Sequence, residues 1–237
     1  MPEKKQGRRS AKEAENTKQQ ILCAAAELFC EFGYKKVSLR KISEQAGVSH
    51  SLLRYHFGSK EKIWQQISDG IYQQFQKYFD SIYLSLDPSL PPHVLLYKIM
   101  NRILARTLID PRANRFLADA VRQNKNMVTY FLEPRAIANQ RLEQIMQDFQ
   151  AKNPESSVSL AQLRWQVMMH AHAATSLTPI MNQVFHEDKA CINSDEAYLL
   201  AQWKMFSQNL ALQLNVSSEY LDDPAELHEL MIELEAN

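Results

Sequence analysis

The fold is decided by the stretch Ser38-Leu39-Arg40-Lys41-Ile42-Ser43-Glu44-Gln45-Ala46-Gly47-Val48-Ser49-His50-Ser51-Leu52-Leu53-Arg54-Tyr55-His56-Phe57-Gly58-Ser59-Lys60. We expect two short helices here, because Ser38 and Ser49 each stand where a helix N-cap accepts an otherwise unpaired backbone N–H. Gly47 supplies the sharp turn between them. Apolar residues at helical spacing give the two helices facing sides, namely Ile42, Ala46, Val48, Leu52 and Leu53. The stretch predicts a helix-turn-helix.

The second of these helices is rich in short polar, basic and aromatic side chains. They are Ser49, His50, Ser51, Arg54, Tyr55 and His56. Side chains of these types are suited to the base edges and phosphates of DNA. We therefore interpret this helix as a candidate recognition helix.

The rest of the chain has an all-α composition. Only 5 of its 237 residues are glycine, 45% are hydrophobic, and apolar residues recur at spacings of three and four. The formal net charge of zero hides an asymmetry. Residues 1–62 hold 13 Lys or Arg and 7 Asp or Glu (net +6), whereas residues 63–237 hold 14 and 20 (net −6). The basic charge is concentrated around the helix-turn-helix.

These patterns predict three segments. Residues 1–16 are polar and basic, and we expect a mobile arm, which is either a solvated tail or a source of phosphate or minor-groove contacts. Residues 17–62 open with a capping-box pattern at Thr17 and form a three-helix, DNA-binding head. Residues 63–237 form a larger helical bundle. A helix from about 60 to 86 links the two, and Pro134 should kink or divide a helix at about 125–150.

Two later helices carry more apolar surface than one packing face needs. The segment at about 159–186 has a single charged residue, Arg164, between Leu160 and Phe185, and the segment at about 194–214 is similarly apolar. A helix that is apolar on all sides must be covered on all sides. We predict that these helices form a homodimer interface about a two-fold axis. The alternative is that they lie at the centre of a monomeric bundle.

Several classes of protein are disfavoured. The chain has neither a signal-peptide pattern nor an apolar run of membrane length, so we expect a cytoplasmic protein. His170 and His172 are two residues apart on a predicted helix and point away from each other, which disfavours a shared metal ion. No catalytic motif occurs, and we predict neither enzymatic activity, nor a metal, nor a cofactor. Cys23, Cys30 and Cys191 are expected to be core residues, and a redox role for them is left open.

The chain resembles the TetR family of bacterial transcriptional regulators. The matching motifs lie between about Thr17 and Ile67. They include Ala24-Ala25-Ala26-Glu27-Leu28-Phe29, Phe32-Gly33-Tyr34, Ala46-Gly47-Val48-Ser49 and Tyr55-His56-Phe57-Gly58-Ser59-Lys60-Glu61. The resemblance implies a dimeric regulator, most often a repressor, that binds a palindromic operator and is released by a small-molecule ligand. It also implies a protein associated with the nucleoid.

Carried over residue by residue, the resemblance assigns DNA contacts. The residue matching Arg40 reaches a base or phosphate, those matching His50, Ser51 and Leu52 face the major groove, and Lys60 binds the backbone. Arg54 departs from the family, where a tyrosine is more usual, so its role is open. The full predicted set of DNA-binding residues is Ser38, Arg40, Ser49, His50, Ser51, Leu52, Arg54, Tyr55, His56 and Lys60.

The implied ligand site is placed only by helix faces. We predict a pocket for an apolar or amphipathic ligand, with Arg106 or Arg122 as candidate anchors for an acidic group. Its predicted lining is Phe75, Phe79, Met100, Ile103, Leu104, Phe116, Met168 and His172. An alternative function is that of an interaction protein, in which a TetR-like body binds a protein partner and DNA serves as a scaffold or is not bound at all.

Overall fold

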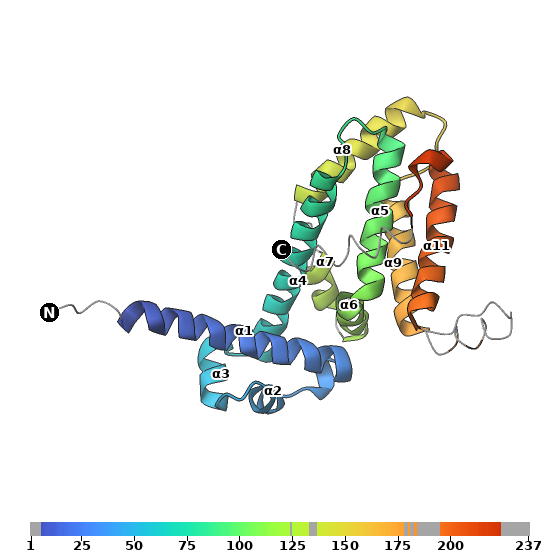
Figure 1. The fold of residues 1–237 in the computed structure, drawn as a ribbon. Helices are drawn as coiled ribbons and strands as arrows, with labels where there is room; N and C mark the ends of the chain where they lie inside the picture. The colour runs from blue at the N-terminus through green and yellow to red at the C-terminus, as the bar shows by residue number, and fades with distance from the viewer. Residues whose placement is uncertain are drawn as a thin grey trace. The chain divides into compact units, whose positions relative to one another are not determined.

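The computed structural model describes residues 6–123, 125–132, 137–177, 180, 183 and 195–223 (Figure 1). All regular elements in this part of the chain are helical, which confirms the predicted all-α class. None of its helices has the length and apolar character needed to cross a lipid bilayer. The elements are α1 (Gln6–Phe32), η1 (Tyr34–Lys36), α2 (Leu39–Gln45), α3 (His50–Phe57), α4 (Lys60–Ser85), α5 (Pro92–Ile109), α6 (Arg112–Gln123), α7 (Lys125–Leu132), α8 (Ile137–Lys152), α9 (Leu160–Ser176), α11 (Asp195–Leu214) and η2 (Ser218–Tyr220).

The chain divides into two compact units. The head unit comprises Met1–Gln73 and Arg115–Glu133, and the body unit comprises Gln74–Asn114 and Pro134–Asn237. This division differs from the boundary expected between residues 62 and 63. Helix α4 contributes to both units, and most of α6, together with α7, belongs to the head unit.

The core of the head unit explains why α6 and α7 belong to it. The Trp64 ring stacks on the Phe116 ring, with centroids 5.0 Å apart and an interplanar angle of 12°. Tyr130 of α7 meets Trp64 edge-on at 6.1 Å and donates a hydrogen bond from its hydroxyl to Asp69 Oδ1 at 3.0 Å. Phe116 shares this buried core with Ile21, Leu28, Phe29, Ile42, Leu53, Ala120 and Met127. The three N-terminal helices are thus completed by a segment distant in sequence.

Helix α1 begins earlier than expected. It runs from Gln6, so residues 6–16 are helical where an arm was predicted, and residues 1–5 lie outside the described part. Thr17 is an interior residue that donates its hydroxyl to the Glu13 carbonyl at 2.9 Å, not an N-cap. Residues 8–16 lack proline and glycine and contain strong helix formers, so the helix extends despite having no apolar stripe there. The Glu15 carboxylate accepts a further bond from Gln19 Nε2 at 3.2 Å.

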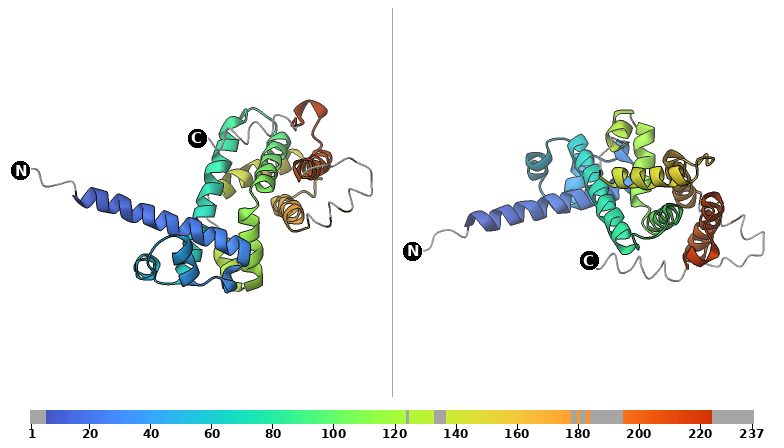
Figure 2. Two further views of the ribbon diagram at one scale, coloured as in Figure 1. Left: turned by 60° about the horizontal axis from the view of Figure 1, so that its bottom comes forward. Right: turned by 90° about the horizontal axis from the view of Figure 1, so that it is seen from above.

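The body unit is built around α5, which packs against α8, α9 and α11. The views of Figure 2 agree that α5, α9 and α11 lie side by side. Polar contacts also join α5 to α11: the Tyr97 and Ser207 hydroxyls are 2.8 Å apart, and Trp203 Nε1 donates to the Asn101 carbonyl at 3.1 Å. Buried groups that are paired in this way hold the register of the two helices.

The remaining predicted elements are found with small shifts. The helix expected at 125–150 is present as α7 and α8, on either side of residues 133–136, which lie outside the described part. The segment expected at 194–214 is α11, and the segment at 159–186 is α9 as far as Ser176. Cys23 is exposed and Cys30 is half-buried, so neither is the fully buried core residue expected, and Cys191 is not described.

Candidate nucleic-acid interface

The first helix of the motif is set by its N-cap. Ser38 Oγ accepts a hydrogen bond from the Lys41 backbone N–H at 3.1 Å, as the sequence predicts. Ile42 is fully buried in the head core. The Lys41 ammonium lies 3.3 Å from the centroid of the Phe32 ring, which ties α2 to the end of α1. Helix α2 is therefore fixed at its start and along its inner side.

The turn and the start of α3 also follow the prediction. Gly47 has a φ of +64°, a conformation that costs a residue with a side chain about 1 kcal/mol or more. Ser49 Oγ then accepts the Leu52 backbone N–H at 3.1 Å and lies 3.0 Å from Ser51 Oγ. Leu53 is buried beneath the helix. The cap and Leu53 together set which face of α3 points outward.

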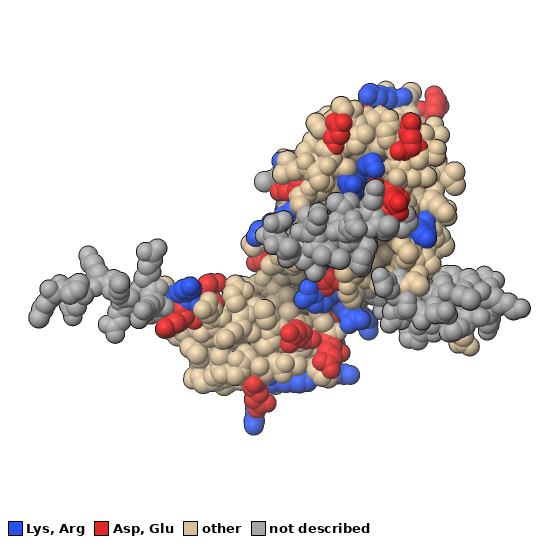
Figure 3. All heavy atoms as spheres, in the orientation of Figure 1, with Lys and Arg blue, Asp and Glu red and all other residues tan. Residues whose placement is uncertain are grey.

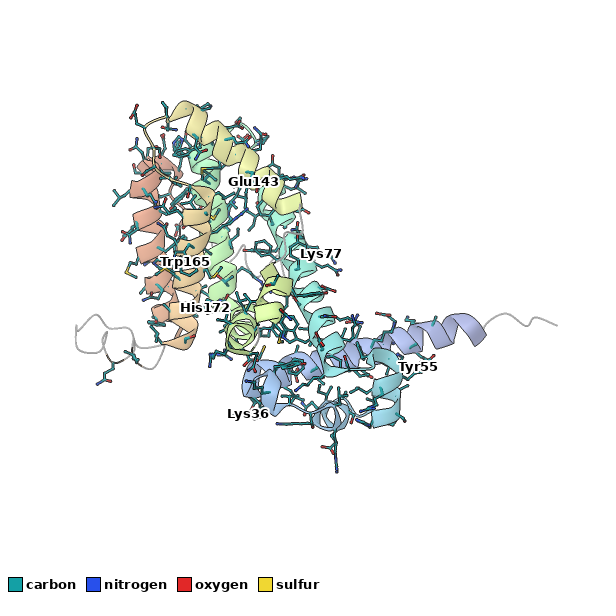
Figure 4. The ribbon with its side chains drawn as sticks, turned by 180° about the vertical axis from the view of Figure 1, so that it is seen from behind. Lys36, Tyr55, Lys77, Glu143, Trp165 and His172 are labelled. Atoms are coloured by element: carbon teal, nitrogen blue, oxygen red, sulfur yellow. The ribbon has the colours of Figure 1, made fainter. Side chains whose placement is uncertain are left out.

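That outward face holds most of the predicted contact residues. His50, Ser51, Leu52, Arg54 and Tyr55 are exposed, and His56 is half-buried. Leu52 therefore lies on the outer face, whereas the apolar pattern alone placed it inward. Tyr55 is 84% exposed and meets the His56 ring edge-on at 5.4 Å. Figure 4 labels Tyr55 on α3.

Arg40 lies on the exposed side of α2 and is engaged with a neighbour. Its Nε donates to Glu44 Oε1 at 2.8 Å, one helical turn away. Both side chains are largely exposed, so the pair is weak and solvent-screened. On the face shown in Figure 3, charged side chains of the head gather at the edge formed by η1 and α2.

Lys60 occupies a different environment from the one expected of a phosphate-binding lysine. Its ammonium donates to the carbonyls of Tyr34 and Val37, each at 2.8 Å, and lies 4.1 Å from the centroid of the Tyr34 ring. Burial lowers the pKa of Lys60, and the negative charge of Asp119 opposes that shift. Lys60 therefore ties the start of α4 to the connection between α1 and α2. A phosphate contact by this residue stays a prediction.

A second tie comes from α6. Asp119 Oδ2 accepts the Tyr34 backbone N–H at 2.7 Å, and Asp119 Oδ1 accepts Gln123 Nε2 at 2.8 Å. A Cβ placed on Gly33, whose φ is +79°, would lie 2.8 Å from Asp119 Oδ1. Gly33 is thus required both by its backbone conformation and by the close approach of this carboxylate. Asp119 and Lys60 hold the same short connection from two different helices.

Sequence reasoning missed Asp119. Phe32-Gly33-Tyr34 stands out as a motif, but its partner lies 85 residues beyond Tyr34 and has no local signal of its own. The motif indicates that the connection between α1 and α2 is constrained. Only the packing of α6 shows that Asp119 is the residue that constrains it.

The predicted ligand-pocket residues are not all brought together. Phe79, Met100, Ile103 and Leu104 share the apolar core of the body unit. Phe116 belongs to the head core instead, because it stacks on Trp64. Phe75 is exposed, and Met168 and His172 are half-buried on α9, where Figure 4 labels His172. One open hollow of about 410 Å³ in the described part has other lining residues, namely Pro88, Ser89, Leu90, Pro92, Leu95, Asp148, Ala151 and Lys152.

The histidine pair on α9 has separate surroundings. His170 Nδ1 lies 2.9 Å from the Gln166 carbonyl of its own helix, and its ring meets Phe206 edge-on at 5.0 Å. Burial lowers the pKa of His172. No cluster of three or more His, Cys, Asp or Glu residues suited to a metal ion occurs in the described part of the chain.

Comparison with known sequences points to one family. Residues 21–67 match the model of "Bacterial regulatory proteins, tetR family". Over 108 residues the chain is 26% identical to the probable HTH-type transcriptional regulator ArpR of Pseudomonas putida, covering 46% of this chain and 50% of that protein. Over 79 residues it is 34% identical to the HTH-type transcriptional repressor NicS of Pseudomonas putida, covering 33% and 37%. The chain spans about half the length, or less, of these relatives, both of which are named as transcriptional regulators.

Comparison with solved structures extends over more of the chain. The regulator FadR of Bacillus subtilis, solved with stearoyl-CoA, aligns with 81% of this chain and 96% of its own at a TM-score of 0.56 and 16% identity. FadR of Bacillus halodurans aligns with 85% and 96% at a TM-score of 0.52 and 17% identity. At these identities the likeness concerns the fold alone. The matched helix-turn-helix and the related regulators agree in likening residues 21–67 to the DNA-binding head of the TetR family of bacterial regulatory proteins.

Proposed function

We propose that this protein is a transcriptional regulator that acts as a repressor. It binds a palindromic DNA operator as a homodimer, and a small-molecule ligand releases it from the operator. In this proposal the head unit binds DNA, and the body unit dimerises and binds the ligand. The protein acts in the cytoplasm, at the nucleoid. The observation that carries the proposal is the exposed polar face of α3.

That face has the chemistry of a recognition helix. Its first turn is held by the Ser49 cap and presents His50 and Ser51 outward, followed by Arg54 and Tyr55. Short polar side chains near the start of such a helix approach base edges in the major groove. Arg54 and Tyr55 supply donors for phosphate or, in the case of arginine, a guanine edge. An apolar residue such as Leu52 suits a thymine methyl group.

The homodimer is supported by exposed apolar side chains on α9 and α11. Trp165 of α9 is 59% exposed and Leu212 of α11 is 81% exposed, and Met169, Leu200 and Met205 are exposed as well. Figure 4 labels Trp165 on α9. Exposed apolar side chains grouped on two neighbouring helices are typical of an interface. A second copy of the chain is the partner proposed, because a palindromic operator has two half-sites roughly 34 to 36 Å apart and needs two recognition helices to fill them.

Footprinting on the DNA that flanks the protein's own gene tests DNA binding. We expect protection of one short palindrome, with affinity falling steeply as salt rises because phosphate contacts release counterions. Binding to all DNA alike, or no binding, would instead favour the alternative of a protein-interaction module.

Sedimentation equilibrium tests the dimer. Trp165→Ala should weaken self-association by about 2 kcal/mol or more if Trp165 lies at the centre of the interface. Leu84→Ala is the matched control, since Leu84 is exposed on α4 and is outside the proposed interface. A monomeric wild-type protein would contradict this part of the proposal.

A further inference from the structure

Helix α5 carries three basic residues on one side. Lys98, Arg102 and Arg106 follow each other at intervals of four residues, so their side chains lie along one stripe of the helix. Their side chains are only 17%, 15% and 18% exposed, respectively. Basic side chains are seldom buried to this extent without counter-charges, so the stripe requires partners.

The two carboxylates nearest this stripe make their closest contacts to residues other than Arg102. Asp222 Oδ1 lies 2.9 Å from Lys98 Nζ but 3.9 Å from Arg102 Nη2. Asp110 lies 3.5 Å from Arg106 Nη2 and is already held by Arg112, whose Nε and Nη2 donate to its two oxygens at 2.6 Å each. The closest contacts of Asp222 and Asp110 are therefore made to Lys98 and Arg112.

Arg102 is the residue left short of partners. Its Nε and Nη1 are buried and have no hydrogen-bond partner among the described residues. A buried donor left without an acceptor costs about 1 to 3 kcal/mol, and more for a charged group. A bound anion would remove that cost, because guanidinium forms strong, directional hydrogen bonds with carboxylates and phosphates.

The surroundings of Arg102 include an aromatic side chain and an apolar core. The Tyr78 hydroxyl donates to the Arg102 carbonyl at 2.8 Å. Burial raises the pKa of Tyr78, and the positive charges of Arg106 and Arg102 oppose that shift. Tyr78 in turn packs against the apolar core that contains Phe79 and Ile103. The cationic stripe thus borders an apolar interior.

We propose that Arg102, flanked by Lys98 and Arg106, binds the carboxylate or phosphate of an amphipathic small molecule whose apolar part lies against the body core. This proposal rests on the proposed function, in which the body unit binds the ligand. Asp222 then acts as an internal competitor that partly neutralises the stripe in the absence of ligand.

Isothermal titration calorimetry on the full-length protein tests this site. The probes are octanoate, octyl phosphate and 1-octanol, which share an apolar chain and differ in the head group. We expect one or both anions to bind and octanol to bind at least about tenfold more weakly, as loss of a charged hydrogen bond predicts. The stronger of the two anions identifies whether a carboxylate or a phosphate is preferred.

Three variants assign the binding to Arg102. Arg102→Gln should weaken anion binding at least about tenfold, and Arg102→Lys, which keeps the charge but loses the planar donors, should lie between it and the wild type. Arg141→Gln is the matched control, because this substitution removes the same charge elsewhere in the body unit. Arg141 Nη1 lies 2.6 Å from Asp80 Oδ1.

Asp222→Asn gives a result that misfolding does not produce. Removing this carboxylate should tighten anion binding several-fold, because Lys98 and Arg102 lose their internal competitor. Equal binding of octanol and the anions, or equal anion binding by Arg102→Gln and the wild type, would overturn the proposal. So would the absence of anion binding by a protein that still protects its operator, and in that case the proposed DNA-binding function would stand.

Discussion

Two partly buried cations, Lys60 in the head unit and Arg102 in the body unit, have different surroundings. Lys60 donates to two carbonyls at 2.8 Å each and lies against the Tyr34 ring. Arg102 has its nearest carboxylate oxygen at 3.9 Å and two buried nitrogens without a partner in the described part of the chain. Lys60 thus holds the connection between α1 and α2, whereas Arg102 has buried donors that no described residue uses. This contrast fits the proposed function, in which the head unit binds DNA and the body unit binds a ligand.

The largest expected effect concerns the core that joins α6 to the head. Trp64→Ala and Phe116→Ala should each lower the free energy of unfolding by about 3 to 5 kcal/mol, because each removes a buried ring. The double variant should cost less than the sum, since the rings contact each other. Urea denaturation measures all three. Additive effects would contradict the assignment of α6 to the head unit, and Trp203→Ala, in the body core, should show no coupling with Trp64→Ala.

The second-largest loss of stability is expected for Lys60→Met. It retains an apolar stem but removes both charged hydrogen bonds, and we expect unfolding to become easier by about 2 kcal/mol or more. Lys62→Met is the control, because Lys62 is exposed and its ammonium donates to the nearby Gln65 Oε1 at 2.9 Å. If Lys60→Met lowered DNA affinity while thermal unfolding stayed unchanged, Lys60 would be a phosphate ligand and not a structural tie.

A smaller effect is expected for Asp119→Asn. The amide oxygen still accepts the Tyr34 N–H, but without the negative charge, so the loss should be about 1 kcal/mol. Thermal unfolding measures it, with Asp148→Asn, an exposed change on α8, as the control. Operator affinity should fall along with stability, because the connection that precedes α2 loosens. A loss in Asp148→Asn of the same size would show that the effect is not local to the head.

The smallest effects on folding are expected on the outer face of the head, where the effect is on DNA binding instead. Arg40→Ala should weaken binding to specific and random DNA alike and lower the salt slope by about one, as expected for a phosphate contact. His50→Ala and Arg54→Ala should change the preferred sequence. Gel-shift titrations over a range of salt separate these roles. Equal loss on both kinds of DNA in all three variants would remove the distinction between them.

The helix-turn-helix was predictable because its signals are local. A capping serine acts within three residues of itself, as Ser38 and Ser49 do, and Gly47 adopts its positive φ within the turn it forms. The N-terminal arm was not predicted correctly, since residues 6–16 are polar on every side and their helical state depends on propensity and on the helix they extend. Leu52 and Leu53 look alike in sequence, and only the packing of α3 selects Leu53 for the core.

The amino-acid sequence by itself determined the helical class, the capped helix-turn-helix and the apolar excess of α9 and α11, because each depends on residues within a few turns of one another. Only the tertiary structure decided that Phe116 and Asp119 complete the head, and that Lys60 is turned inward towards carbonyls. It also decided that Asp222 meets Lys98 more closely than Arg102. Each of these contacts joins residues far apart in the chain, and whether a buried charge is paired depends on distances that no local pattern encodes.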